Sequence, residues 1–152
     1  MKGPSLLYIG HFEVAVAAPI VITPTPLGLR RMVPILGGTV SGPIGSGVVL
    51  PGGADFQIIE AGGITRLDAR YAIEMNDGVR ITVHNIGLRH GSPQDMERLA
   101  RGQSVDPDRI YFRSAPVFEA PSPAYDWLNR SIFVATGARE QSSVLLDIYK
   151  VE

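Results

Sequence analysis

Apolar and polar residues alternate along most of this chain, a pattern typical of β-strands that bury one face. Between residues 67 and 75 the odd positions are apolar or aromatic, whereas Asp68, Arg70 and Glu74 share the other face. Comparable strand-like segments are predicted at residues 5–16, 31–40, 46–50, 54–60, 64–76, 79–88, 109–118, 130–138 and 143–151. The pattern therefore indicates an all-β protein.

Glycine is concentrated in the stretch from Gly37 to Phe56, which has seven glycines in twenty residues. The stretch lacks both the P-loop signature and the G-x-G-x-x-G register, so it is not a phosphate-binding loop. Glycine among Val, Ile and Leu is typical of bends and bulges where strands approach closely. This predicts a strongly curved sheet.

Short connections punctuate the strands. Asn76-Asp77-Gly78 predicts a type I′ hairpin turn, and Ala61-Gly62-Gly63 predicts a second turn of this kind. The proline-rich segment 19–34 is expected to be an irregular loop over the surface or a barrel mouth.

One helix is predicted after residue 92. Ser92 is suited to the N-cap, Pro93 to the first helical position and Gly102 to the C-terminal stop. Ser122-Pro123 is expected to open a single further turn.

These elements predict one domain spanning residues 1–152. The expected fold is an antiparallel β-barrel of about eight or nine strands with one short helix. A β-sandwich shares the strand pattern, but we favour the barrel.

Composition narrows the classes of function. The net charge of −1 gives no basic footprint for nucleic acid. The chain has no cysteine, which excludes disulfides, zinc–thiolate sites and cysteine nucleophiles. The apolar stretch 6–22 is interrupted by His11 and Glu13, so we interpret it as a strand and not as a secretory signal. We expect a cytoplasmic protein without membrane contact.

The strand 79–89 changes character along one face. Its odd positions begin with Val79, Ile81 and Val83 and continue to Asn85 and Arg89. A barrel interior that becomes polar near its mouth would show this pattern, which makes Asn85 and Arg89 candidate substrate-binding residues. Alternatively, the strand simply leaves the core and Arg89 points into water.

Asp55 follows a Pro-Gly-Gly bend and is a candidate catalytic acid or base. Its alternative role is to cap the backbone amides of its own turn. Arg70 and Arg113 are candidates for holding an oxyanion or carboxylate, with a structural ion pair as the alternative for Arg113. Phe118 and Trp127 are candidate pocket walls, or else plain core.

A metal site is not expected. His84 and His90 lie roughly 20 Å apart on a continuous strand, which is too far for one ion. His11-Phe12-Glu13 matches half of a zinc-deaminase motif, but the required cysteine pair is missing. We expect no cofactor.

Several motifs together resemble the domain-of-unknown-function family numbered 3237, also called uncharacterised protein family 0311. They are Gly37-Gly38-Thr39, Leu50-Pro51-Gly52-Gly53-Ala54-Asp55, Leu67-Asp68-Ala69-Arg70-Tyr71, Asn85-Ile86-Gly87, Arg89-His90-Gly91, Tyr111-Phe112-Arg113, Pro116-Val117-Phe118-Glu119 and Tyr125-Asp126-Trp127-Leu128-Asn129-Arg130. The resemblance implies a small β-barrel, with suspected kinship to the barrels of allene oxide cyclases and dirigent proteins. It also suggests self-association into a homo-oligomer, and it implies no established activity.

Two functions remain open. The first is a cofactor-independent isomerase, cyclase or hydro-lyase acting on a small, mostly apolar, oxygenated compound. The second is a non-catalytic barrel that binds a small hydrophobic or oxygenated ligand. A third and weaker hypothesis is a scaffold whose interior is filled, which a cavity below about 100 Å³ would favour, against roughly 300 Å³ for ordinary pockets.

Overall fold

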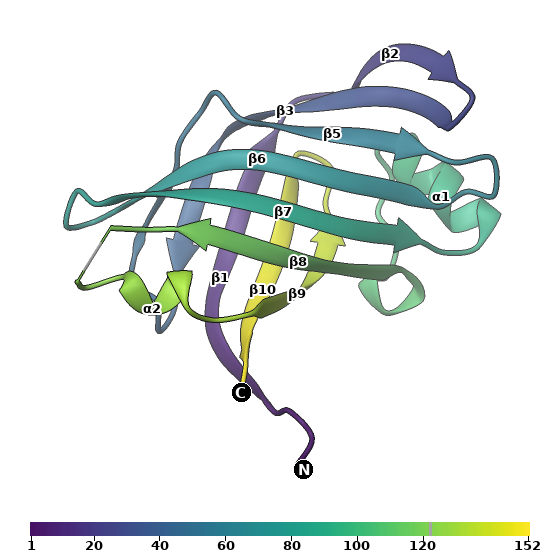
Figure 1. The fold of residues 1–152 in the computed structure, drawn as a ribbon. Helices are drawn as coiled ribbons and strands as arrows, with labels where there is room; N and C mark the ends of the chain where they lie inside the picture. The colour runs from purple at the N-terminus through teal and green to yellow at the C-terminus, as the bar shows by residue number, and fades with distance from the viewer. Residues whose placement is uncertain (122) are drawn as a thin grey trace.

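The computed structural model describes residues 1–121 and 123–152, and most of them belong to one strongly curved antiparallel sheet (Figure 1). Ser122, the first residue of the predicted second turn, lies outside the described residues. The strands are β1 (Leu6–Val16), β2 (Ile20–Thr25), β3 (Gly28–Ser41), β4 (Gly47–Val49), β5 (Ala54–Ile59), β6 (Thr65–Met75), β7 (Arg80–His90), β8 (Tyr111–Glu119), β9 (Phe133–Arg139) and β10 (Ser143–Val151).

The sheet closes on itself through β1. This strand pairs with β10 along one edge and with β3 along the other, where Val14 lies opposite Gly38. The result is a closed eight-stranded antiparallel barrel with two extra strands. The predicted barrel is thereby confirmed over the sandwich.

The short strands β4 and β5 share one place in the barrel, between β3 and β6. They follow one another along this gap and are separated by the Pro51-Gly52-Gly53 bend. A β-carbon on Gly53 would lie 2.5 Å from the carbonyl oxygen of Arg70, so the close approach of the two strands requires glycine here.

The prediction of an irregular loop over residues 19–34 was wrong. This segment forms β2 and the first half of β3, which pair as a hairpin (Figure 1). The first half of β3 also pairs with β5, so β2 alone is the added edge strand. Pro24 is compatible with β2 because β2 pairs only with β3, and an edge strand tolerates the missing N–H.

The type I′ turns were also predicted incorrectly. The hairpin itself is present, but its turn is of another type. A type I′ turn needs a positive φ at both central residues, whereas among residues 76–78 only Gly78 (φ 84°) has one. The N–H of Gly78 donates to the carbonyl oxygen of Met75 at 2.8 Å. Gly63 (φ 87°) closes the other hairpin in the same way.

The predicted helix is confirmed as α1 (Pro93–Ala100), and the Ser92 side chain accepts a hydrogen bond from the N–H of Asp95. Two shorter helices are η1 (Pro107–Arg109) and α2 (Asp126–Asn129). No helix in the described part of the chain is long and apolar enough to cross a membrane.

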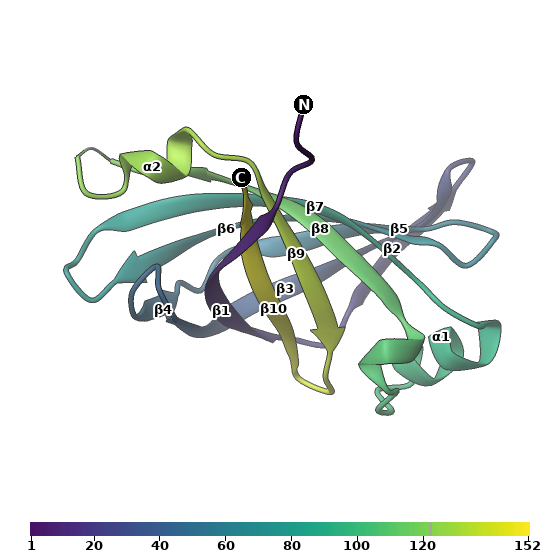
Figure 2. The same cartoon turned by 90° about the horizontal axis from the view of Figure 1, so that it is seen from below.

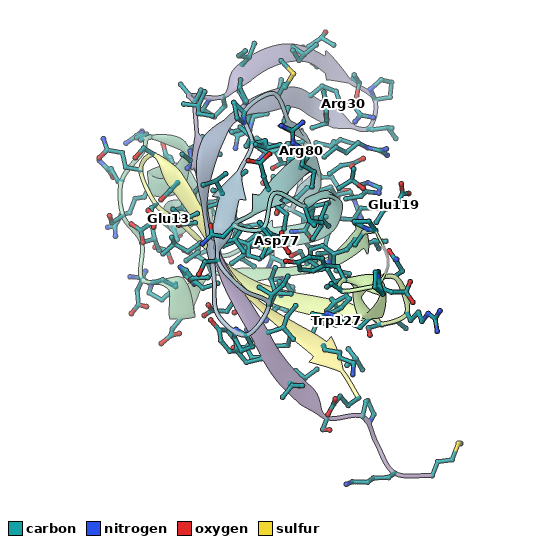
Figure 3. The ribbon with its side chains drawn as sticks, turned by 90° about the vertical axis from the view of Figure 1, so that its left-hand side faces the viewer. Glu13, Arg30, Asp77, Arg80, Glu119 and Trp127 are labelled. Carbon is teal, nitrogen blue, oxygen red and sulfur yellow. The ribbon has the colours of Figure 1, made fainter. Side chains whose placement is uncertain are left out.

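The two ends of the barrel differ. Near α2, the aromatic rings of Phe118, Phe133 and Trp127 pack edge to face, with centroid separations of 5.1 Å for Phe118–Phe133 and 6.0 Å for Trp127–Phe133. Figure 3 looks at this end, with Trp127 on α2. The opposite end lies near α1 (Figure 2) and contains the polar interior described below.

Gly38→Ala is expected to lower the free energy of unfolding by about 1–3 kcal/mol. Gly38 has a φ of 138°, and a β-carbon there would lie 2.0 Å from the carbonyl oxygen of Glu13, across the seam that closes the barrel. Urea unfolding measures the change. Gly62→Ala is the control, because nothing lies within 4 Å of its added β-carbon. Equal stabilities of the two variants would contradict this account of the seam.

Candidate functional site

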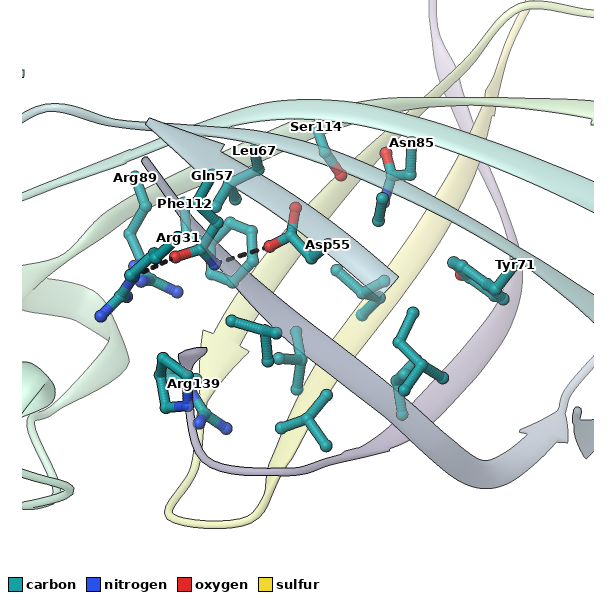
Figure 4. A pocket seen from close by; sticks show the side chains of 18 residues that line it. Arg31, Asp55, Gln57, Leu67, Tyr71, Asn85, Arg89, Phe112, Ser114 and Arg139 are labelled. Atoms are coloured by element: carbon teal, nitrogen blue, oxygen red, sulfur yellow. Dashed lines mark hydrogen bonds between the residues drawn. The ribbon is translucent and has the colours of Figure 1, made fainter. Parts of the chain in front are cut away.

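A cavity of about 50 Å³ opens at the α1 end of the barrel (Figure 4). Its volume corresponds to a few water molecules. Apolar side chains from β1, β3, β6 and β10 form much of the wall. The polar side chains that line it are Arg31, Asp55, Gln57, Tyr71, Asn85, Arg89, Ser114 and Arg139.

Inward- and outward-facing residues alternate along β7, and its inward polar residues Asn85 and Arg89 line this cavity. Ile81 and Val83 are buried in the core, and Asn85 and Arg89 follow on the same inward face, nearer the open end. Arg89 is only 4% exposed. The alternative in which Arg89 points into water is therefore wrong.

Asp55 lies on the inward face of β5, directly after the Pro-Gly-Gly bend. Its Oδ2 accepts a hydrogen bond from Nε2 of Gln57 at 2.6 Å, and its Oδ1 accepts one from the backbone N–H of Asp68 at 2.9 Å. These partners lie on β5 and β6, so the carboxylate does not cap its own turn.

The β5–β6 pairing explains why the backbone N–H of Asp68 is available to a side chain instead of to the neighbouring strand. Asp55 lies opposite Ala69, and the regular pairing resumes only where Ile58 lies opposite Arg66. Asp68 is in the interval, and the Asp55 carboxylate accepts the hydrogen bond of its N–H. The carboxylate is thus fixed by the sheet itself.

Burial raises the pKa of Asp55 above its ordinary value. The hydrogen bonds from Gln57 and Asp68 and the charges of Arg89 and Arg31 act in the opposite direction, but the loss of solvation is the larger effect. A carboxyl group whose pKa is shifted upward inside a cavity is suited to exchange protons near neutral pH.

Three arginines reach the same cavity from different strands: Arg31 on β3, Arg89 on β7 and Arg139 on β9. Nε of Arg31 donates to Oε1 of Gln57 at 2.6 Å, which links it to Asp55 (Figure 4). The guanidinium of Arg89 lies over the ring of Phe112, 5.7 Å from its centroid. Burial lowers the pKa of Arg89 to about 10, so it remains a cation at neutral pH.

Four buried polar atoms of the cavity have no hydrogen-bond partner among the described residues. They are the Tyr71 hydroxyl, Oδ1 of Asn85, Nε of Arg89 and Oγ of Ser114. Buried polar groups are normally paired, and an exception needs an explanation. Because all four belong to the cavity lining, a polar occupant would provide that explanation.

The structure brings together three of the predicted site residues, Asp55, Asn85 and Arg89, and keeps four away from the cavity. Arg70 lies on the outward face of β6, where its Nε is 3.7 Å from Oδ1 of Asp68. The outward-pointing guanidinium of Arg113 lies over the Tyr111 ring at 5.4 Å. Strand parity explains both positions, because each arginine is adjacent to an inward-facing residue.

Phe118 and Trp127 belong to the packed end of the barrel rather than to the cavity wall. Arg70 and Phe118 instead border a wide surface groove near α2. This groove is open to solvent. Of the four residues with unpaired buried atoms, it shares only Tyr71 with the cavity.

Sequence reasoning missed Arg31, Gln57, Ser114, Tyr71 and Arg139 as members of the site. Gln57 has the same parity as Asp55 and could have been found from it. Arg31 lay where the predicted loop 19–34 and the predicted strand 31–40 overlap, so no inward face was assigned to it.

Two histidine–carboxylate pairs lie outside the cavity. Nδ1 of His11 is 2.7 Å from Oδ1 of Asp147, and Nε2 of His84 is 2.8 Å from Oδ1 of Asp68. Across residues 1–121 and 123–152, no three side chains of His, Cys, Asp or Glu are grouped as a metal site would require.

The family DUF3237, a family of proteins of unknown function, matches residues 4–151. This chain belongs to DUF3237. A UPF0311 protein from Rhodopseudomonas palustris is 47% identical over 124 residues, which cover 82% of this chain and 81% of that protein. A UPF0311 protein from Clostridium acetobutylicum is 42% identical over 139 residues, covering 91% and 88%.

Solved structures agree with the DUF3237 fold seen here. The crystal structure of the R. palustris protein has a TM-score of 0.94 at 39% identity, covering 100% of this chain and 99% of that one. A β-barrel-like protein from Acinetobacter baumannii has a TM-score of 0.87 at 36% identity, covering 100% and 98%. The first is described as a protein of unknown function.

The stability of the protein relative to its Asp55→Asn variant is expected to fall as the pH rises above about 4. The native pKa of Asp55 is raised, so between the unfolded pKa of about 3.9 and the native pKa the folded state binds the proton more tightly. Rising pH therefore removes stability from the wild type and not from the variant.

Urea unfolding at a series of pH values measures this difference. Asp77→Asn is the control of opposite sign, because hydrogen bonds from the N–H of Val79 and from the Tyr125 hydroxyl lower the pKa of Asp77. If the stability of the wild type relative to Asp55→Asn instead rises with pH, the arginine charges lower the pKa of Asp55 by more than burial raises it.

Proposed function

We propose that this DUF3237 protein is a cofactor-independent enzyme that transfers protons on a small, mostly apolar, oxygenated compound. The reaction class would be isomerisation, cyclisation or addition and elimination of water. The observation that carries the proposal is Asp55, a fixed carboxyl group with a raised pKa in a cavity that also has unpaired polar atoms.

In this proposal Asp55 removes a proton from, or delivers one to, the substrate carbon that neighbours an oxygen-bearing carbon. Removal leaves negative charge on the neighbouring oxygen and a neutral Asp55. The Ser114 hydroxyl, which is unpaired, can donate a hydrogen bond to that oxygen. Return of the proton to a different atom completes an isomerisation with no net consumption of acid or base.

The size of the cavity limits the substrate. At about 50 Å³ it lies below the size that we associated with a ligand site, which by itself would favour a filled scaffold. An interior evolved only for packing, however, would not bury four unpaired polar atoms. We therefore favour a small occupant, or the polar end of a longer one that extends out of the mouth.

A more distant structural relative is described as an enzyme. An enzyme from Penicillium herquei has a TM-score of 0.74, covering 100% of this chain and 97% of that one. At 21% identity the likeness establishes the fold alone, and the reaction of that enzyme does not transfer to this chain.

The second candidate function is a ligand carrier without catalysis. Asp55 is the one acidic side chain among the described residues that line the cavity, so no second carboxyl group completes an acid–base pair. A carrier would use the same polar atoms for binding only. The cytoplasmic location and the self-association remain predictions.

Ala69→Leu is expected to abolish binding of small ligands, because Ala69 lines the cavity and the added atoms fill it. The probes are 2-butanone, 2-butanol and butyrate, and ligand-observed NMR measures their binding. Ala72→Leu is the control, since Ala72 lies on the outward face of the same strand and borders the surface groove. Thermal unfolding checks that both variants fold. Unchanged binding by Ala69→Leu would exclude the cavity as the site.

Catalysis is tested by proton exchange in D₂O. If Asp55 is the base, the protein is expected to speed deuterium incorporation next to the carbonyl of 2-butanone or levulinate. Asp55→Asn should reduce the rate by about 10²–10⁴-fold while binding persists. NMR measures both quantities. Binding without faster exchange would indicate the carrier instead.

A further inference from the structure

The mouth of the cavity carries more positive than negative charge. Arg31, Arg89 and Arg139 converge there from three strands, and Figure 4 shows their side chains on the same side of the cavity. Asp55 is the acidic residue of the lining within the described chain, so with Asp55 ionised two positive charges remain uncompensated. Arg89 is almost fully buried, and Arg31 and Arg139 are partly buried. Such an excess of one charge is unusual in surroundings of this kind.

No acidic side chain of residues 1–121 or 123–152 forms an ion pair with these three arginines. Arg31 instead donates to Gln57, and Nη1 of Arg139 donates to the carbonyl oxygen of Ser143 at 3.0 Å. Arg89, the most buried of the three, has an unpaired Nε. The fold thus holds three cations near a single carboxylate, Asp55, which forms no direct ion pair with any of them.

Their proximity helps to lower the pKa values of Arg31 and Arg89. Burial, and then the charge of Arg139, lower the pKa of Arg31; burial, and then the charge of Arg31, lower the pKa of Arg89. Mutual repulsion of buried cations destabilises the fold unless an anion relieves it.

The rest of the cavity wall indicates what kind of anion would fit between the arginines. Beyond the arginines the wall includes Val33, Ile35 and Leu146, which are almost fully buried. A fully polar ion such as phosphate would leave this apolar wall without a partner. An anion with one charged end and an apolar body satisfies both parts.

We propose that the cavity binds a small monocarboxylate, with its carboxylate between the guanidinium groups of Arg89, Arg31 and Arg139 and its apolar end toward Val33 and Ile35. This inference rests on the proposed function and names its substrate class. A hydroxyl or keto oxygen farther along the molecule would lie near Asn85 and Ser114, within the part of the cavity that contains Asp55.

Arg89 is the central recognition residue. Its planar guanidinium is held over the Phe112 ring, which orients its donors before any ligand arrives. A carboxylate accepts from such a fork with two parallel hydrogen bonds, and the unpaired Nε provides one of the donors.

The experiment compares acid and neutral analogues on the intact chain by calorimetry. Butyrate and butyramide have nearly the same size, and chloride and phosphate serve as anions without an apolar body. We expect butyrate to bind at least about tenfold more tightly than butyramide. Arg89→Gln should remove this preference and leave butyramide binding nearly unchanged.

Arg80→Gln is the matched control. Arg80 lies on the same strand, at its opposite end near α2, and its side chain is 72% exposed (Figure 3). This variant should bind butyrate like the wild type. In the absence of acid, Arg89→Gln should be at least as stable as the wild type, because it removes a buried charge without an ion-pair partner.

The outcomes separate the two proposals. Equal binding of butyrate and butyramide would overturn carboxylate recognition and leave the small-molecule site intact. Binding of chloride or phosphate as tight as that of butyrate would overturn the assignment to carboxylates. No binding of any probe would overturn the proposed function together with this inference.

Discussion

The pairing of β1 with β3 is the interaction on which the rest of the molecule depends. A curved sheet with free edges would leave its concave face open to water, and the polar residues there would be ordinary solvated side chains. Closure at Val14 and Gly38 removes that water. The raised pKa of Asp55 and the burial of Arg89 follow from closure and not from any local motif. Glycine at position 38 is what allows the two backbones to approach.

Closure also explains why the interior divides into two zones. At the α2 end, aromatic rings fill the barrel and exclude any occupant. Toward α1, the inward positions of β3, β5, β7 and β9 change to arginine, aspartate, glutamine and asparagine. Because neighbouring strands are antiparallel, these positions lie at opposite chain ends of adjacent strands, far apart in the sequence. The cavity is therefore a property of the register and is held rigidly by the same hydrogen bonds that close the barrel.

The period-two pattern predicts much of this fold, since each strand of a closed barrel has one face inside and one face outside. It correctly placed Asn85 and Arg89 along β7 and identified Asp55 after its bend. The pattern already placed Arg70 on the polar face of its strand with Asp68 and Glu74, and the structure shows Arg70 pointing outward. Arg70 and Arg113 were nevertheless grouped with the site, although their parity directs both outward. Arg31 and Arg139 escaped because cross-barrel proximity depends on register, which the sequence of a single strand does not contain.

The distribution of charge inside the barrel favours an interior shaped for a ligand over one shaped by packing alone. A sequence under selection for stability alone would pair buried cations or replace them with apolar residues, because either change avoids their repulsion. Here three arginines on separate strands share the cavity with one aspartate, so two positive charges have no carboxylate to offset them. In the proposed function this arrangement costs stability in the free protein, and a bound anion offsets that cost. Stability is typically given up in this way at sites of binding or catalysis, and this supports the proposal that the open end of the barrel is the functional end.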